Sequence, residues 1–308
     1  MSVPFSTIWT QYFPPKGPLT EANLPSQTGK VFIVTGGSNG LGYELSRQLY
    51  GAGGKVYILT RSKDRTETAM AKIRAHYQEE DAGKKQRGSL EFVQMDLMDF
   101  ASVRTAAREF LAREGPNGRL DVLQRTSKIA DPGAVRVTWP GSLMVETSSP
   151  KDGVRKEFLN DPAAAPKEFK MNQNELYAST KAACYFLATE FSRREPREGG
   201  GVIHLAGNPG NYATNLWAHV PTLLYALVRP ALRNPSPHGA DTWLWMGLSD
   251  EVTLEDAAAG RYAMCDGRWH PGQRGDLVAA LRDVSEGGSG RAKEVFEWCE
   301  KEVAEFLK

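Results

Sequence analysis

Short runs of apolar, β-branched residues alternate along the first third of the chain with longer stretches of helical periodicity. Residues 30–35, 55–60 and 90–95 have the composition of strands, whereas residues 43–51 and 63–78 carry apolar residues at helical spacing. Strands that alternate with helices pair in parallel, with a helix in each crossover. This pattern predicts an α/β fold built on a parallel sheet.

The same alternation continues toward the carboxyl end. The further predicted elements are a helix at 100–113, strands at 119–123 and 135–139, a helix at 174–194, a strand at 202–206 and an amphipathic helix at 292–307. Ahead of them, residues 1–27 contain Pro14, Pro15 and Pro18, which predicts an irregular N-terminal arm. We expect residues 28–308 to form a single domain.

Composition removes several classes of function. A formal net charge of +1, from 38 basic and 37 acidic residues, provides no field that would attract nucleic acid. The most apolar stretch, residues 217–232, is interrupted by Pro221 and Arg229 and is shorter than the roughly 20 residues of a membrane span. We therefore expect no nucleic-acid partner and no transmembrane span, while association of this stretch with a membrane surface stays open.

The three cysteines, Cys184, Cys265 and Cys299, lie far apart in the chain. They match neither the spacing of metal ligands nor a disulfide framework, which suits a reducing compartment. The sequence also begins without the basic and apolar regions of a secretory signal. We expect a cytoplasmic protein without a metal site.

A glycine-rich segment, Thr-Gly-Gly-Ser-Asn-Gly-Leu-Gly at residues 35–42, lies between the first predicted strand and the helix that follows. Gly36, Gly40 and Gly42 would let the backbone approach a pyrophosphate at the N-terminus of that helix. The strand–turn–helix context is the one that this motif requires. The segment predicts phosphate binding, and the alternative is a purely structural turn.

The second and third strands end in residues that could read an adenosine group. A cation at the end of the second strand pairs with a 2′-phosphate, so Arg61 favours NADP(H) over NAD(H). The alternative is a solvated surface arginine. Asp96, just past the third strand, could reach the adenine amino group or cap the following turn.

Tyr177 and Lys181 lie four residues apart in the long helix predicted at 174–194, and hence on one face, with about 6 Å between their Cβ atoms. A phenol with a pKa near 10 is a poor acid–base group at neutral pH. A neighbouring ammonium stabilises the phenolate and brings its proton within reach of carbonyl–alcohol exchange. The pair predicts an acid–base site, and the alternative is a surface pair.

Taken together, these motifs resemble the short-chain dehydrogenase/reductase family, most closely its fungal and retinol-dehydrogenase-like branch. The resemblance extends from about residue 28 to residue 220. It is carried by the glycine-rich segment, Asp96-Leu97, Leu-Asp-Val-Leu at 120–123, Tyr177 with Lys181, and Pro-Gly-Asn-Tyr-Ala-Thr at 209–214. It implies a Rossmann-type, doubly wound parallel sheet in three layers, a small-molecule substrate and, as one arrangement, a homodimer.

The resemblance also implies individual roles. Tyr177 would be the acid/base, Lys181 would lower its pKa and hold the nicotinamide ribose, and Ser142, after the strand at 135–139, would bind the substrate oxygen. For Ser142 the alternative is a plain strand-end hydroxyl. The residues assigned to the cofactor are Gly36, Ser38, Asn39, Gly40, Leu41, Gly42, Arg61, Asp96, Leu97, Tyr177, Lys181, Pro209, Gly210, Tyr212 and Thr214. Of these, Pro209, Gly210 and Thr214 would seat the nicotinamide carboxamide.

The sequence departs from the family pattern between Leu123 and Val135, which only eleven residues separate. The family places an Asn-Asn-Ala-Gly turn, a sheet-covering helix and a loop there. A helical crossover between parallel neighbours takes a dozen residues or more, so we expect a truncated crossover after the fourth strand. The proton-relay asparagine of the family is lost with the turn. The sequence leaves open whether the deletion is real or coding sequence is missing.

Three hypotheses follow. The first is an NADP(H)-dependent oxidoreductase that interconverts a carbonyl and an alcohol on a hydrophobic small molecule, in secondary metabolism. The second is a nucleotide-binding protein without turnover, and the third is a family member recruited to non-redox chemistry. In the expected substrate-side segment, about 211–275, an apolar pocket or ordinary core would use Trp217, Leu223, Leu224, Tyr225 and Trp243.

Overall fold

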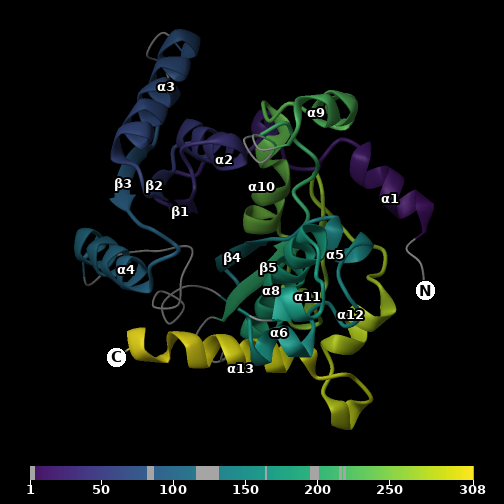
Figure 1. The fold of residues 1–308 in the computed structure, drawn as a ribbon. Helices are drawn as coiled ribbons and strands as arrows, with labels where there is room; N and C mark the ends of the chain where they lie inside the picture. The colour runs from purple at the N-terminus through teal and green to yellow at the C-terminus, as the bar shows by residue number, and fades with distance from the viewer. Residues whose placement is uncertain are drawn as a thin grey trace. The chain divides into compact units, whose positions relative to one another are not determined.

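The computed structural model describes residues 4–81, 87–115, 132–163, 165–194, 201–214, 217 and 220–307 (Figure 1). The chain divides into two compact units, each described by itself. The three-stranded unit comprises Leu19–Thr126 and Asn211–Leu244. The four-stranded unit comprises Met1–Pro18, Ser127–Gly210 and Trp245–Lys308.

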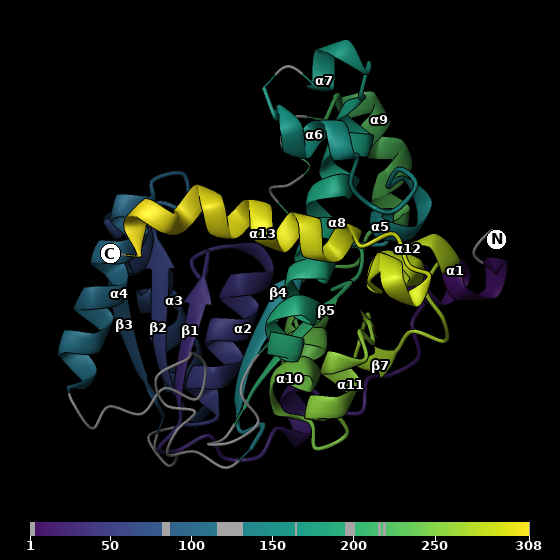
Figure 2. The same cartoon turned by 90° about the horizontal axis from the view of Figure 1, so that it is seen from below.

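The three-stranded unit is built on a parallel sheet in the order β1-β2-β3, whose strands stand side by side in Figure 2. Its strands are β1 (Val31–Thr35), β2 (Lys55–Thr60) and β3 (Ser89–Gln94), with Thr35 opposite Leu59 and Thr60 opposite Gln94. The four central residues of β2 are all buried, as expected for the middle strand of a covered parallel sheet.

Helices cover this sheet. The unit contains η1 (Glu21–Asn23), α2 (Gly40–Gly51), α3 (Lys63–Asp81), α4 (Phe100–Glu114), α9 (Thr222–Val228), η4 (Arg229–Ala231) and η5 (His238–Ala240). The side chain of Asp99 accepts a hydrogen bond from the Ala101 N–H and starts α4. Phe110 of α4 then packs edge to face on Tyr57, with ring centres 4.9 Å apart, and anchors α4 on one face of the sheet.

The four-stranded unit has the order β4-β5-β6-β7. The strands β4 (Val135–Pro140), β5 (Val202–Gly207) and β6 (Ala263–Met264) run parallel, and β7 (Arg268–Trp269) is antiparallel to β6. Its helices are α1 (Phe5–Tyr12), α5 (Met144–Thr147), α6 (Lys156–Asn160), α7 (Ala165–Glu168), α8 (Gln173–Arg194), α11 (Leu254–Ala258), α12 (Gly275–Ala280), η6 (Val284–Glu286), α13 (Arg291–Val303) and η7 (Ala304–Phe306). The helix α10 (Asp241–Leu248) begins in the other unit and ends in this one.

The core of the four-stranded unit forms where α8, α12 and α13 meet β5. Tyr185 and Phe186 of α8 are fully buried there, together with Ala206 of β5, Leu277 of α12 and Val295 of α13. Burial of such side chains contributes about 1.5–3 kcal/mol each. This packing fixes α8 along the strands that it covers.

A histidine interrupts the apolar run of β5. His204 is buried and its ring stacks on Phe191, with centres 5.0 Å apart. Its Nδ1 accepts a hydrogen bond of 3.3 Å from the Trp139 indole, which fixes the proton on Nε2. Burial lowers the pKa of His204 from 6.5 to about 4, so the imidazole is neutral in the folded protein at pH 7.

The expected α/β architecture with parallel strands is confirmed, and the predicted elements up to residue 113 agree with the structure to within a few residues. The strand predicted at 119–123 lies outside the described residues. So does most of the shortened connection that follows it. The assignment of residues 28–308 to one domain stays a prediction.

The sequence predicted an irregular N-terminal arm, but part of this arm is a helix. Residues Phe5–Tyr12 form α1, with Pro4 as its N-cap. Proline is compatible with a helix start, and Pro14 and Pro15 prevent its continuation, so the prolines delimit a helix here. In the described part of the chain, no helix is long and apolar enough to cross a membrane.

Candidate active site

The turn after β1 has the backbone that the glycine-rich segment predicts. Gly36 and Gly40 adopt positive φ angles of 69° and 55°, and the side chain of Asn39 accepts a hydrogen bond of 2.7 Å from the Gly40 N–H. A Cβ on Gly42 would lie 2.6 Å from the Gly36 carbonyl oxygen. The turn therefore folds back on itself in a way that admits no side chain at position 42, and α2 starts directly from it.

Residues expected at the cofactor lie beside this turn in the three-stranded unit. The methyl group of Thr214 lies next to Gly40, because a Cβ added at Gly40 would be 3.4 Å from that methyl carbon. The Tyr212 hydroxyl donates a hydrogen bond of 2.7 Å to the His238 carbonyl oxygen. Ser38 and Leu41 are partly buried residues of the turn and of the first turn of α2. The segment after residue 210 thus returns to the glycine-rich turn.

Arg61 and Asp96 follow the carboxyl ends of β2 and β3. Because parallel strands end at one edge of their sheet, both lie at the edge that carries the glycine-rich turn. The side chain of Arg61 is exposed, as is that of Leu97. The Asp96 carboxylate accepts a hydrogen bond of 3.0 Å from the Met98 N–H, which is the turn-capping role.

Tyr177 and Lys181 share one face of α8 in the four-stranded unit, as their spacing predicts. The Lys181 Nζ lies 5.5 Å from the centre of the Tyr177 ring, and both residues are half-buried. The helix is regular around them, and the Thr180 hydroxyl donates a hydrogen bond to the Tyr177 carbonyl oxygen. The structure therefore brings the phenol and the ammonium together.

Ser142 lies two residues beyond β4 in the same unit, and its backbone is clamped by Tyr262. The Ser142 N–H donates to the Tyr262 hydroxyl at 2.9 Å, and that hydroxyl donates to the Ser142 carbonyl oxygen at 3.2 Å. Burial raises the pKa of Tyr262 well above its usual value near 10, so the phenol keeps its proton and serves in both roles. A Cβ on Gly141 would lie 2.0 Å from this hydroxyl, so position 141 requires glycine.

The Ser142 hydroxyl also has a local partner. Its oxygen accepts a hydrogen bond of 3.1 Å from the Met144 N–H at the start of α5. A hydroxyl that accepts one bond can still donate its proton and accept a second. The strand-end role and the substrate-binding role are therefore compatible.

Pro209 and Gly210 follow β5, the parallel neighbour of β4. Asn208 forms their turn, because its side-chain oxygen accepts a hydrogen bond of 3.1 Å from the Gly210 N–H, where φ is +103°. The Gly141 N–H bonds the Gly207 carbonyl oxygen at 2.8 Å and holds the two strand ends together. This turn and Ser142 thus lie at one edge of the four-stranded sheet.

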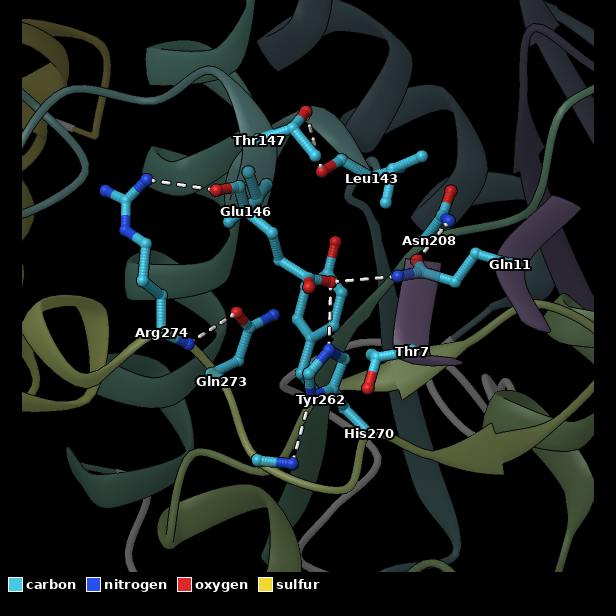
Figure 3. Close-up of polar contacts among 12 residues, drawn as sticks. Thr7, Gln11, Leu143, Glu146, Thr147, Asn208, Tyr262, His270, Gln273 and Arg274 are labelled. Atoms are coloured by element: carbon cyan, nitrogen blue, oxygen red, sulfur yellow. Dashed lines mark hydrogen bonds and ion pairs between the residues drawn. The ribbon is translucent and has the colours of Figure 1, made fainter. Parts of the chain in front are cut away.

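Sequence reasoning missed a buried polar network behind this edge (Figure 3). The Glu146 carboxylate accepts hydrogen bonds from His270 Nε2 at 2.9 Å and from Gln11 Nε2 at 3.1 Å, and all three side chains are buried. The Gly272 N–H donates to His270 Nδ1, which places the imidazole proton on Nε2, facing the carboxylate. No local spacing links these residues, since 124 positions separate Glu146 from His270.

The residues expected to line an apolar pocket differ in their exposure and contacts. Trp217 and Tyr225 lie with ring centres 6.4 Å apart, and Leu223 is largely exposed rather than core. Trp243 is half-buried, and the side chain of Leu224 lies outside the described residues.

Known proteins resemble this chain in sequence. The family model described as short chain dehydrogenase matches residues 30–135. The chain is 31% identical to the short-chain dehydrogenase/reductase bet4 of Neocamarosporium betae, over 99% of this chain and 95% of that protein. That alignment extends over 349 positions, so at least 41 of them hold no residue of this 308-residue chain.

Solved structures share the fold. An uncharacterized protein of Mycobacterium paratuberculosis is 19% identical, with a TM-score of 0.58 over 93% of this chain and 97% of that one. A 3-oxoacyl (acyl-carrier-protein) reductase of Agrobacterium tumefaciens, solved with NADP bound, is 17% identical, with a TM-score of 0.52 over 82% of this chain and 98% of that one.

Proposed function

Because the chain belongs to the short-chain dehydrogenase/reductase family and is an oxidoreductase of that class, we propose that it interconverts a carbonyl and an alcohol on a hydrophobic small molecule with NADP(H). The observation that carries the proposal is the Tyr177–Lys181 pair on α8, in the same unit as Ser142. Two relatives named short-chain dehydrogenase/reductase support the class of reaction, and a substrate from secondary metabolism is part of the proposal.

In the direction of reduction, Ser142 donates a hydrogen bond to the substrate carbonyl oxygen. Tyr177 gives its phenolic proton to that oxygen as the carbon accepts the hydride that NADPH supplies when bound. The charge of Lys181 stabilises the resulting phenolate. Oxidation of the alcohol reverses each transfer, and Tyr177 then accepts the hydroxyl proton.

The three-stranded unit contains a turn that fits the cofactor phosphates. A Cβ at Gly36 would meet no atom within 4 Å, so this part of the turn is open to close approach, and the N-terminus of a twelve-residue helix favours an anion. Arg61, exposed at the same sheet edge, would pair with a 2′-phosphate. The NADP bound to the Agrobacterium tumefaciens reductase supports this assignment.

The proposal is tested first by thermal denaturation of the whole chain with NADPH and with NADH. A ligand at a hundred times its dissociation constant adds about 2.7 kcal/mol to the free energy of unfolding. We expect a single cooperative transition that NADPH raises more than NADH does, followed by NADPH-dependent reduction of hydrophobic ketones. A transition that neither cofactor moves would contradict the proposal.

A second candidate is a protein that binds the cofactor without turnover. Two features favour this candidate. The alignment with the protein from Neocamarosporium betae contains positions that hold no residue of this chain, and the Asn-Asn-Ala-Gly motif is missing from its sequence. A shift of the transition by NADPH, with no reduction or oxidation across a panel of ketones and alcohols, would favour this candidate instead.

Replacement of Arg61 by Asp should reverse the cofactor preference. The new carboxylate would repel a 2′-phosphate and accept a hydrogen bond from a 2′-hydroxyl. We expect the ratio of kcat/KM for NADPH to that for NADH to fall by about 100-fold, since the change alters a charge-assisted contact at one site. Arg65→Asp, an exposed arginine on the first turn of α3, is the matched control and should leave the ratio unchanged. If Arg61→Asp leaves the ratio unchanged, Arg61 is a solvated surface arginine and does not bind the 2′-phosphate.

A further inference from the structure

The N-terminal helix α1 buries its polar face. Gln11 is 1% exposed and Thr7 is also buried, whereas Trp9 is 52% exposed and its ring lies tilted against that of Phe13, with ring centres 4.5 Å apart. A helix held by the hydrophobic effect would be oriented the other way. Polar contacts must therefore account for the position of α1.

Two of these contacts reach the carboxyl end of α1. The thiol of Cys265 lies 3.5 Å from the Gln11 carbonyl oxygen, and the Arg268 guanidinium donates to the Thr10 carbonyl oxygen. Both partners come from the β6–β7 hairpin, and a cation at a helix carboxyl end is favourable. These two contacts hold the carboxyl end of α1, where Gln11 lies, against the hairpin.

The Gln11 side chain uses both ends of its amide. Its Nε2 donates to the Glu146 carboxylate at 3.1 Å, and its Oε1 accepts a hydrogen bond of 2.7 Å from Asn208 Nδ2. Figure 3 shows the amide between these two partners. Asn208 follows β5, and Glu146 lies in α5, which follows β4, so one amide joins the segments after two neighbouring strands.

Each partner leads directly to a residue assigned to the reaction. Asn208 accepts the Gly210 N–H through its side-chain oxygen, so a fixed Asn208 fixes the Pro209–Gly210 turn. Glu146 belongs to the same short helix whose first N–H is bound by the Ser142 hydroxyl, so a fixed Glu146 holds α5 against Ser142. The Gly141–Gly207 backbone hydrogen bond joins the two strand ends, and the Gln11 amide adds a second link between the segments beyond them.

We propose that Gln11 is a positioning residue, which keeps the Pro209–Gly210 turn in place for the nicotinamide carboxamide and Ser142 in place for the substrate oxygen. The role rests on the proposed function, because it needs a nicotinamide at that turn. Gln11 lies ahead of residue 30, where the match to the family model begins. The amide acts through Asn208 and Glu146 and touches neither cofactor nor substrate.

The test compares two ligands on the full chain. Gln11→Met keeps the length of the side chain and removes both hydrogen bonds. NADPH has a nicotinamide half, whereas adenosine 2′,5′-bisphosphate has only the adenosine half and its phosphates. We expect Gln11→Met to raise the dissociation constant of NADPH by about tenfold, which corresponds to one or two buried hydrogen bonds. The dissociation constant of adenosine 2′,5′-bisphosphate should stay unchanged. Both constants are measured by calorimetry. Trp9→Met, an exposed position on the same helix, is the control and should weaken neither.

A second variant approaches the same hydrogen bond from its other partner. Asn208→Asp retains an oxygen for the Gly210 N–H but has no N–H to donate to Gln11. If the two side chains act through their shared bond, the double variant Gln11→Met/Asn208→Asp should weaken NADPH no more than the stronger single variant. Should Gln11→Met fail to fold, Asn208→Asp alone is measured against the same two ligands.

The outcomes distinguish the role of Gln11 from the proposed function of the chain. Equal weakening of both ligands, or full additivity in the double variant, would show a merely structural role and overturn the positioning role of Gln11. Undiminished NADPH affinity of Gln11→Met would overturn it too. A wild-type chain that binds neither ligand would overturn the proposed function itself, and the role of Gln11 with it.

Discussion

Replacement of Tyr177 by Phe should reduce kcat for carbonyl reduction by about 10²–10⁴-fold, the usual contribution of general acid–base catalysis. The variant lacks the proton that the substrate oxygen must receive, while the ring that lies over Lys181 remains. NADPH affinity should change little, because Lys181 and the glycine-rich turn are intact. The measurement is kcat with a reducible ketone at saturating NADPH, with the dissociation constant of NADPH from thermal denaturation.

The matched control for this variant is Thr180→Val, an exposed neighbour on α8 whose hydroxyl donates to a backbone carbonyl oxygen of its own helix. It should retain kcat within about twofold, because Thr180 has no part in the proposed proton transfer, and its free energy of unfolding should change by about 0.5 kcal/mol at most. A Tyr177→Phe protein as active as the wild type would remove Tyr177 from the mechanism.

The free energy of unfolding should fall by about 3 kcal/mol between pH 6.5 and pH 4 through His204 alone. The folded pKa of about 4 lies below the unfolded value of 6.5. The unfolded chain therefore binds a proton as the pH falls through 6.5, while the folded protein binds it only near pH 4. This stabilising contribution is fully present above pH 6.5 and is lost across that interval. Urea unfolding at half-unit steps of pH measures it.

Other groups also titrate in this interval, so the effect is read as a difference from His204→Gln. Glutamine keeps an acceptor for the Trp139 indole and does not titrate. The variant should be less stable at pH 7, since it loses the stacking on Phe191, but its stability should depend less on pH. Parallel pH curves for the two proteins would contradict the low pKa of His204.

Local patterns in the sequence predict most of the elements because each element carries its own signal. The strand β2 has the predicted bounds, and the glycine-rich turn has the positive φ angles that its glycines suggest. The Tyr177–Lys181 pair also follows from spacing alone, because residues four apart share a helix face. Periodicity and turn chemistry are sufficient where both partners lie within one element.

Features that depend on distant partners could not be predicted in this way. Gln11 and Asn208 are 197 positions apart, and neither has a pattern that marks it as buried. Helix α1 was missed because the prolines of residues 1–27 indicated an irregular arm, although Phe5, Ile8, Trp9 and Tyr12 have helical spacing. No local pattern shows that its polar face is the buried one. The Tyr262 clamp on Ser142 likewise joins residues 120 positions apart.

The polar attachment of α1 also bears on the order of events during synthesis. Thr10 is translated 258 residues before Arg268, whose guanidinium donates a hydrogen bond to the Thr10 carbonyl oxygen, and Gln11 precedes Asn208 by 197 residues. At roughly 5–20 residues per second, the first helix waits on the order of 10–50 s for the contacts that hold it. During that time Phe5, Trp9 and Phe13 are present in the cell on a segment without its anchor, and they are candidate sites for a chaperone.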